Sequence, residues 1–188
     1  MENSKKKNML LHSCCGPCST TVIFELSKEY DLTIFYYNPN IYPTQEYEKR
    51  KAEQLRLVNE LNQTKQINIK VLEAPYDSEN YENVVAELHN EKEGGARCEV
   101  CFKLRLDKTA REAKKNNFDV FATTLTVSPH KNAPLINKIG EELSKKYEIE
   151  YLVSDFKKKD GYKKSIEYSK EYKLYRQNYC GCKYSIWF

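Results

Sequence analysis

Short apolar runs alternate along this chain with longer stretches in which apolar and polar residues mix. The runs are rich in β-branched and aromatic residues and are shorter than a typical helix, which favours strands covered on both faces. They occupy residues 9–12, 32–37, 67–72, 120–125 and 150–153. We therefore predict five strands at these positions.

The intervening stretches predict helices. Their apolar residues recur at spacings of three and four, as Val22, Ile23 and Leu26 do, which places them on one helix face. Ser19 and Thr20 are candidate N-caps of the first helix, because short hydroxyl side chains accept hydrogen bonds from free backbone N–H groups there. Helices are expected at 19–30, 44–62, 83–90, 98–116, 133–147 and 161–175.

This alternation predicts an α/β fold, a single-domain three-layer sandwich with a mainly parallel sheet. Residues 1–188 contain no repeat and no long linker rich in Pro, Gly or Ser, so we expect one domain that begins with a flexible polar segment at 1–8. Functional groups of such sheets gather beyond the carboxyl ends of the strands. The segments 14–18, 38–43 and 123–130 are expected at that edge.

Composition limits which partners and which cellular compartment the sequence is compatible with. The net charge of +4 comes from 31 basic and 27 acidic residues, a mixed surface that is compatible with a nucleic-acid partner. Many of the 15 tyrosines lie among lysines in the C-terminal third, where they can stack on bases, although packing of a helix onto the core is the favoured interpretation. The apolar run at 9–11 is too short for a signal peptide and no stretch reaches the length of a membrane helix, so we expect a cytoplasmic protein without a membrane partner.

The most informative residues are seven cysteines in three tight groups. The groups are CC-x-x-C at 14–18, C-x-x-C at 98–101 and C-x-C at 180–182. In a reducing cytoplasm such clusters are typical of metal or redox sites, and an odd count argues against a closed disulfide framework. The side chains of Cys14 and Cys15 are expected to diverge on an extended backbone, which suits the several irons of a cubane cluster better than a single zinc ion. The spacing of the cysteines alone does not exclude zinc.

The last cysteine group has a different character. A disulfide between Cys180 and Cys182 would close a very small, strained ring and would be easily reduced. We therefore favour a redox-active pair. The alternative is that both thiols are ligands of a further metal. The chain contains neither GxxxxGK[ST] nor GxGxxG, so nothing indicates a nucleotide-driven reaction.

Five strings of sequence, in order over nearly the whole chain, resemble the epoxyqueuosine reductase QueH family. The combination of CC-x-P-C, R-C-x-x-C and Y-C-G-C is specific, whereas no single one of these motifs would be. The strings are LLHSCCGPCS at 10–19, YNPNIYP at 37–43, RCEVCFKLRL at 97–106, TTLTVSPHKN at 123–132 and LYRQNYCGCKYS at 174–185.

The resemblance implies an oxidoreductase that deoxygenates the epoxide of epoxyqueuosine in the tRNA anticodon, the last step of queuosine synthesis. It implies an external electron donor, no cobalamin, and a fold similar to the adenine-nucleotide α-hydrolase-like (HUP-type) proteins. It further implies an additional mononuclear iron, for which Cys18 is the candidate ligand, and a redox-active pair of Cys180 and Cys182. A [4Fe-4S] cluster would be held by Cys14, Cys15, Cys98 and Cys101.

Other roles rest on weaker signals. Tyr42 and Arg176 are predicted contacts for the tRNA, and the candidate proton donors are Tyr179, His12 and His130. Two other functions remain as alternatives, a non-catalytic zinc-stabilised RNA-binding module and a thiol–disulfide oxidoreductase that uses only the C-terminal cysteine pair.

Overall fold

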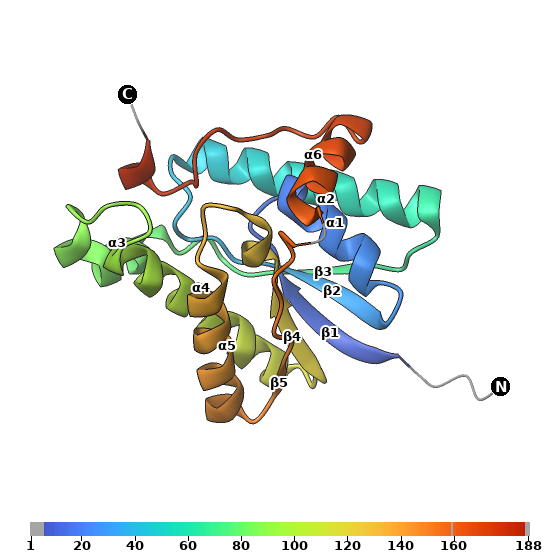
Figure 1. Ribbon diagram of the computed structural model, residues 1–188, viewed down its shortest axis with the longest axis horizontal. Helices are drawn as coiled ribbons and strands as arrows, with labels where there is room; N and C mark the ends of the chain where they lie inside the picture. Colours follow the sequence, from blue (N-terminus) through green and yellow to red (C-terminus); the bar gives the residue numbers. More distant parts are fainter. Residues whose placement is uncertain (1–5, 159, 187–188) are drawn as a thin grey trace.

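The centre of the fold is a five-stranded sheet (Figure 1). The computed structural model describes residues 6–158 and 160–186. The strands are β1 (Lys7–His12), β2 (Tyr30–Tyr36), β3 (Lys70–Glu73), β4 (Val120–Thr123) and β5 (Glu150–Tyr151). Their order is β3-β2-β1-β4-β5, and every pairing is parallel. The predicted parallel α/β sheet is confirmed.

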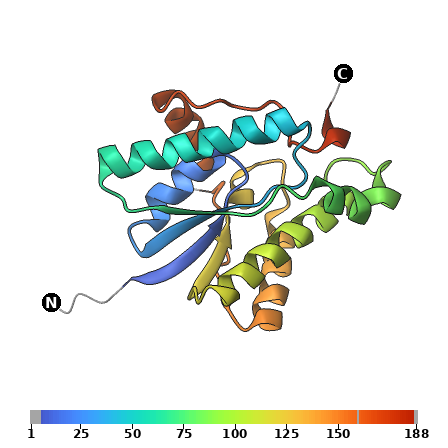
Figure 2. The ribbon, with the colours of Figure 1, turned by 180° about the vertical axis from the view of Figure 1, so that it is seen from behind.

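Helices cover both faces of the sheet (Figures 1 and 2). Three of them, α1, α2 and α6, lie on one face, and α4 and α5 lie on the other. The helices are α1 (Gly16–Leu26), α2 (Thr44–Lys65), α3 (Ser78–Val85), α4 (Ala96–Lys115), α5 (Ala133–Tyr147) and α6 (Gly161–Glu171). Short 3-10 turns follow at η1 (Ala86–Leu88), η2 (Thr124–Val127) and η3 (Lys183–Ser185).

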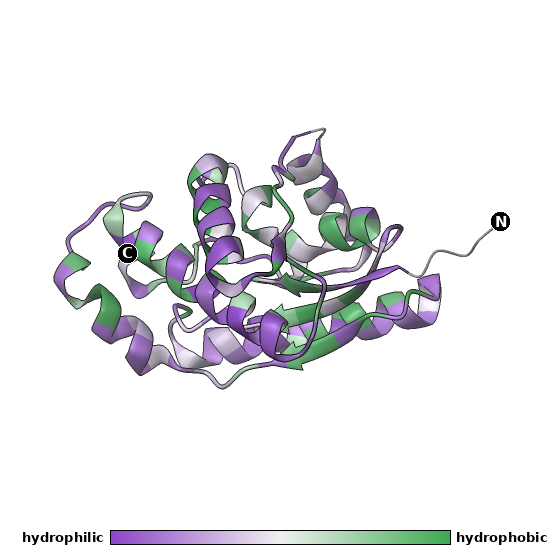
Figure 3. Cartoon of the chain, turned by 90° about the horizontal axis from the view of Figure 1, so that it is seen from below, coloured by the Kyte–Doolittle hydropathy of each residue, from purple (hydrophilic) through white to green (hydrophobic). Residues whose placement is uncertain are grey.

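Each face of the sheet has its own hydrophobic core. Side chains alternate along β1, so Met9 and Leu11 pack with α1 and α2, whereas Leu10 packs with α4 and α5. All three residues are fully buried. Figure 3 shows the same pattern, with hydrophobic residues concentrated in the strands and mixed with hydrophilic ones along the helices. The two cores account for the three layers predicted from the sequence.

The first helix begins earlier than predicted. Cys15 is its N-cap residue and Pro17 lies in its first turn, where a missing N–H costs nothing and the fixed φ favours helix. Ser19 and Thr20 are therefore inside the helix, and their hydroxyls donate to the carbonyls of Gly16 and Pro17 at 2.9 and 3.0 Å. The prediction that they are N-caps is wrong.

Other element ends also differ from the predicted ones. The helix expected at 83–90 runs from Ser78 to Val85 and continues as η1, and the helix expected at 161–175 ends at Glu171. A left-handed residue, Lys173 (φ 49°), turns the chain after α6 so that the side chain of Leu174 enters the core. Residues 7 and 8 belong to β1 rather than to a flexible segment, and residues 1–5 lie outside the described chain.

The carboxyl ends of β1, β2 and β4 lead into segments that carry candidate functional residues. β1 is followed by Ser13 and the first cysteines, β2 by Tyr37 and Asn38, and β4 by η2. Within residues 6–158 and 160–186, no helix is both long and apolar enough to cross a membrane.

Candidate metal centre

Three cysteines converge at the start of α1. The sulfur atoms of Cys14, Cys15 and Cys18 all lie within 4.8 Å of one another, and those of Cys14 and Cys15 are 3.7 Å apart. The predicted divergence of Cys14 and Cys15 is therefore wrong, because the chain turns at Cys15 from strand into helix. That turn also brings Cys18, one helical turn onward, to the same point. We call these three residues the cysteine triad.

The triad favours negative charge. The start of a helix carries a partial positive charge, which stabilises thiolates. Hydrogen bonds from the other two thiols hold the pKa of Cys14 well below its usual range, and hydrogen bonding to Cys14 raises the pKa of Cys15 to about 11. The triad therefore loses a first proton readily and shares the resulting charge. Soft sulfur donors so arranged suit zinc or an iron–sulfur centre.

Polar side chains surround the triad. Gln177 donates through Nε2 to Cys15 Sγ at 3.0 Å, and the Thr124 hydroxyl is 3.7 Å from Cys14 Sγ. The side chain of Ser13, just before the triad, is held by Gln54 of α2, whose Oε1 accepts from Ser13 Oγ at 2.7 Å. These contacts fix the triad from the C-terminal segment, from the end of β4 and from α2.

The other four cysteines line one common cavity. Cys98 and Cys101 come from the first turns of α4, and Cys180 and Cys182 from the C-terminal segment, although about eighty positions of sequence separate the two groups. Cys101 and Cys182 are buried, whereas Cys98 and Cys180 are half-buried. We call this the cysteine cavity. All seven cysteines are free thiols.

Loop and helix place Cys98 and Cys101 on the same side of α4. Cys98 Sγ accepts from the backbone N–H of Gly94 at 3.2 Å. Burial raises the pKa of Cys98, and it raises that of Cys101 to about 12. Without a metal, both thiols would therefore stay protonated at neutral pH, even with Arg105 4.0 Å from Cys101 Sγ.

The C-terminal pair depends on long-range contacts. Buried Arg50 of α2 donates to the carbonyls of Cys180 and Tyr179 at 3.1 and 3.3 Å, and the N–H of Tyr42 donates to the Gly181 carbonyl at 2.7 Å. Gly181 has φ +115°, and a Cβ there would approach Arg50 Nη1 to 3.0 Å. This position therefore requires glycine. The hydroxyl of Tyr81 lies 3.1 Å from Cys182 Sγ.

Two cations connect the triad with the cysteine cavity. Arg105 of α4 acts electrostatically on Cys101, Cys14 and Cys180. Lys131, which lines the cavity, acts on Cys180, Cys14 and Cys18. The fold thus assembles all three cysteine groups around shared charges at the carboxyl edge of the sheet.

The candidate proton donors have different surroundings. Burial lowers the pKa of His12 to about 3, so it is neutral; its Nε2–H donates to the Tyr37 carbonyl at 3.1 Å and its Nδ1 contacts Thr123 Oγ1 at 3.0 Å. His12 is a structural link between strand ends. His130 is exposed and lines the cysteine cavity, and the Tyr179 hydroxyl donates to the Tyr42 carbonyl at 2.5 Å.

The two predicted tRNA contacts lie on the surface. The Tyr42 side chain is 51% exposed beside the segment that carries Cys180. Arg176 is also exposed, but its guanidinium donates to Ser169 Oγ of α6 at 3.1 Å.

Most C-terminal tyrosines pack against the protein. The rings of Tyr168 and Tyr172 lie 4.7 and 6.2 Å from that of Phe24 on α1. Tyr175 donates to Glu46 at 3.1 Å, and Tyr184 donates to Glu82 at 2.9 Å. The favoured interpretation, that these rings pack a helix onto the core, is confirmed for Tyr168 and Tyr172, whereas Tyr175 and Tyr184 bond to carboxylates of α2 and α3.

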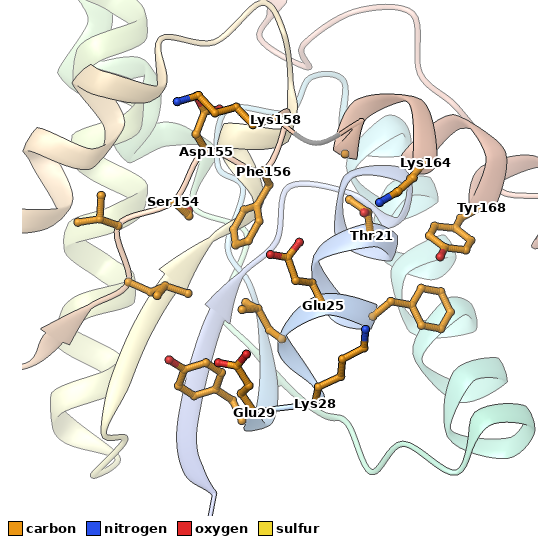
Figure 4. Close-up of a pocket in the computed structure, with 16 residues that line it drawn as sticks. Thr21, Glu25, Lys28, Glu29, Ser154, Asp155, Phe156, Lys158, Lys164 and Tyr168 are labelled. Carbon is orange, nitrogen blue, oxygen red and sulfur yellow. The ribbon is translucent and has the colours of Figure 1, made fainter.

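Away from the cysteines, α1, α6 and the segment after β5 enclose a larger open pocket of about 650 Å³ (Figure 4). Its walls mix Phe156 and Tyr168 with charges of both signs, such as Glu25 and Lys164. It contains no cysteine. Charges of both signs around an open pocket do not select one ligand class, so the cysteine edge remains the stronger functional site.

Comparisons with known proteins agree on one family. The family model of Epoxyqueuosine reductase QueH matches residues 9–187. An Epoxyqueuosine reductase QueH of Streptococcus pyogenes serotype M1 is 45% identical over 98% of this chain and 72% of its own length. The proteins of that name in Staphylococcus aureus and Thermotoga maritima are 44% and 38% identical, over 94% and 95% of this chain and 75% and 90% of their lengths. The chain belongs to the QueH family.

The fold of this QueH-family chain also has a solved neighbour. A predicted subunit of a tRNA methyltransferase from Methanocaldococcus jannaschii aligns with a TM-score of 0.51 at 18% identity, covering 87% of this chain and 74% of that one. At that identity the likeness concerns the fold alone, and it supports the predicted HUP-type α/β architecture. The QueH relatives are named reductases, so the chain is an oxidoreductase, as predicted.

Sequence reasoning missed several residues of the QueH-family site. Arg105 follows Cys101 by four positions and so shares its helix face, which was a usable signal. Lys131 and Gln177 lie inside the quoted motifs, but nothing in their spacing indicates that they point at sulfur. Arg50 and Tyr81 lie outside the five strings, and only the fold brings them to the cysteines.

Proposed function

We propose that this chain removes the epoxide oxygen of epoxyqueuosine in the tRNA anticodon to give queuosine. The reaction consumes two electrons and two protons, breaks both C–O bonds of the epoxide and releases water. The observation that carries the proposal is the assembly of three remote cysteine groups at one sheet edge in a member of the QueH family.

The donor set fits a metal centre. The triad offers three sulfurs within 4.8 Å, and the cysteine cavity adds two pairs of thiols around shared cations. We propose that Cys14, Cys15, Cys98 and Cys101 hold a [4Fe-4S] cluster and that Cys18 is a ligand of an additional iron. When bound, such a centre supplies single electrons and a Lewis acid for an oxygen atom, without cobalamin.

The protein's own residues would handle thiol redox chemistry and protons. Cys180 and Cys182 face the same cavity as Cys98 and Cys101, which suits a pair that returns electrons from an external donor. His130 lines this cavity and is open to solvent, whereas His12 is buried, neutral and bonded at both nitrogens. We therefore favour His130 over His12 as the donor of a proton to the departing oxygen.

The tRNA would approach the same edge. Tyr42 presents an exposed ring beside the Cys180 segment, and base stacking on such a ring is a common contact with single-stranded anticodon loops. Arg176 would contact the phosphate backbone from the neighbouring surface.

The direct test is turnover on epoxyqueuosine-containing tRNA with anaerobically purified protein and dithionite. Nuclease digestion and mass spectrometry would quantify queuosine. We expect the unmodified chain to convert its substrate and Cys98→Ala to lose at least about 100-fold in turnover. Loss of a residue that only supports a metal ligand costs up to about that much, and loss of the ligand itself should cost no less. Glu99→Ala, an exposed change on the same helix turn, is the matched control and should keep its activity. Full turnover by Cys98→Ala would refute the cluster assignment.

Metal analysis of the same preparations separates the alternatives. A brown protein with bound iron and sulfide is the expected outcome. A colourless protein that holds only zinc and binds RNA without turnover would favour the structural zinc module. Turnover of small disulfides by metal-free protein, abolished in Cys180→Ala, would favour the thiol–disulfide oxidoreductase.

A further inference from the structure

Arg105 is a buried cation with weak partners. Only 2% of the residue is exposed. Its Nη2 donates to Asn38 Oδ1 at 2.6 Å, its Nη1 lies 4.0 Å from Cys101 Sγ, and its Nε has no hydrogen-bond partner among the described residues. No carboxylate within the described chain forms a salt bridge with it. Burying an unpaired guanidinium is strongly unfavourable unless an anion compensates its charge.

The other two buried arginines of the site have more partners than Arg105, although Arg97 Nε also lacks one among the described residues. Arg50 pairs with Glu46 at 2.7 Å. Arg97, on the same helix as Arg105, donates to three backbone carbonyls, including that of His89 at 3.0 Å. Arg105 has neither a carboxylate nor a set of carbonyls, so its compensation has to come from the sulfurs around it.

Lys131, from the loop after η2, repeats the pattern. It is half-buried and lines the cysteine cavity, and within the described residues no carboxylate lies within salt-bridge distance of it. Burial opposes its charge, yet nearby Cys180 and Cys14 raise the pKa of Lys131 above its usual range. The one carboxylate that lines the cavity, Glu93, stands near Cys98 and pairs with neither cation.

Asn38 fixes Arg105 relative to the triad. The Asn38 Nδ2 donates to the carbonyl of Ser13 at 2.9 Å, while its Oδ1 accepts from Arg105. Ser13 immediately precedes Cys14, and Arg105 lies one helical turn after Cys101. One amide therefore ties the backbone of the triad to the helix that carries Cys98 and Cys101.

We propose that Arg105 and Lys131 are the built-in counter-charge of the cysteine centre, with Arg105 held in register by Asn38. The inference rests on the proposed function, because it requires a bound, net anionic metal–thiolate centre. Both are positioning residues: they stabilise the added electron and the bound metal without being ligands. A fixed positive charge makes reduction more favourable, so its removal should lower the reduction potential.

The test is the midpoint potential of the reconstituted centre, measured by redox titration of the visible or EPR signal. Arg105→Gln should shift the one-electron equilibrium at least tenfold toward the oxidised form. This corresponds to a midpoint potential about 59 mV more negative. Arg105→Lys keeps the positive charge, so its potential should lie close to that of the unmodified chain. Lys131→Gln should shift the potential in the same direction by less, since Lys131 is less buried.

A matched control removes the same charge from the same helix. Arg111 is an exposed residue of α4 paired with Asp107, and Arg111→Gln should leave the potential unchanged. Asn38→Ala should keep the positive charge of Arg105 but loosen its position. Iron loss to a chelator should therefore accelerate, while the potential shifts less than in Arg105→Gln. Equal potentials in the unmodified chain, Arg105→Gln and Lys131→Gln would overturn the proposal.

Two readouts separate the possible failures. If the unmodified chain binds no iron, the proposed function itself fails. If it binds iron and the variants match it in potential and in retention, only the counter-charge assignment fails. If Arg105→Gln does not fold, the Lys131→Gln variant decides the case, with Arg105→Lys as the reference that retains the charge. A Lys131→Gln potential that is unchanged or more positive refutes the assignment.

Discussion

The cysteine triad and the C-terminal cysteine pair reach the same edge of the sheet by different means. The triad is local: five consecutive positions, a turn at Cys15 and the start of α1 bring its sulfurs together. The pair is placed from a distance, by Arg50 on α2, by the backbone of Tyr42 and by a glycine with positive φ. Local geometry should survive remote mutations, whereas the position of the pair depends on the whole fold.

The largest effect is expected within the triad. Cys15 is 1% exposed and its sulfur lies within 4.8 Å of two others, so Cys15→Ala removes one proposed ligand from the interior of the site. Turnover should fall by at least about 100-fold, and most of the iron should be lost because its affinity falls. Iron analysis and the tRNA assay measure this effect. Retention of both iron and turnover would show that the triad is not the metal site.

The next effect concerns Arg50, which holds the pair. Arg50→Met leaves Glu46 without its cationic partner, although Tyr175 still donates to it, and frees two carbonyls of the C-terminal segment. Because one member of a buried ion pair is removed, the free energy of unfolding should fall by about 3–5 kcal/mol. Urea unfolding of the apo protein measures it. An unchanged unfolding midpoint would mean that the segment is held by other contacts.

A smaller and more selective effect is expected at Gly181. An alanine there must adopt φ near +115° and approach Arg50 and Ile41, a strain of about 1–3 kcal/mol. In Gly181→Ala the pair should shift while the triad stays in place, so turnover should fall about tenfold with iron content unchanged. Joint loss of iron and turnover would instead make Cys180 and Cys182 metal ligands.

The smallest effect sets the baseline for the other variants. Lys146 is an exposed residue of α5, a helix without a cysteine, and it forms an ion pair with Asp107 at 2.8 Å. Lys146→Gln should change the free energy of unfolding by less than about 1 kcal/mol and leave iron and turnover unaffected. A larger loss would show that urea unfolding reports general surface changes rather than the site.

The sequence predicted the fold class and the cysteine edge because both depend on local patterns. Five apolar runs and the helical spacing between them were enough for the parallel sheet, although Pro17 and Lys173 moved the ends of α1 and α6. The convergence of Cys14 with Cys15 was missed, since an extended backbone was assumed where the chain enters a helix. Arg50 and Asn38 could not be found from spacing, because their contacts cross from one element to another.

The most direct test of the central claim is iron and sulfide analysis of anaerobically purified protein, compared between the two cysteine regions. The proposed cluster predicts about four irons and four sulfides per chain, with any further iron held through Cys18. Cys14→Ala with Cys15→Ala should lose both elements, and Cys180→Ala with Cys182→Ala should retain them. An unmodified chain that holds zinc without sulfide, or a triad variant that keeps its iron, would contradict the account.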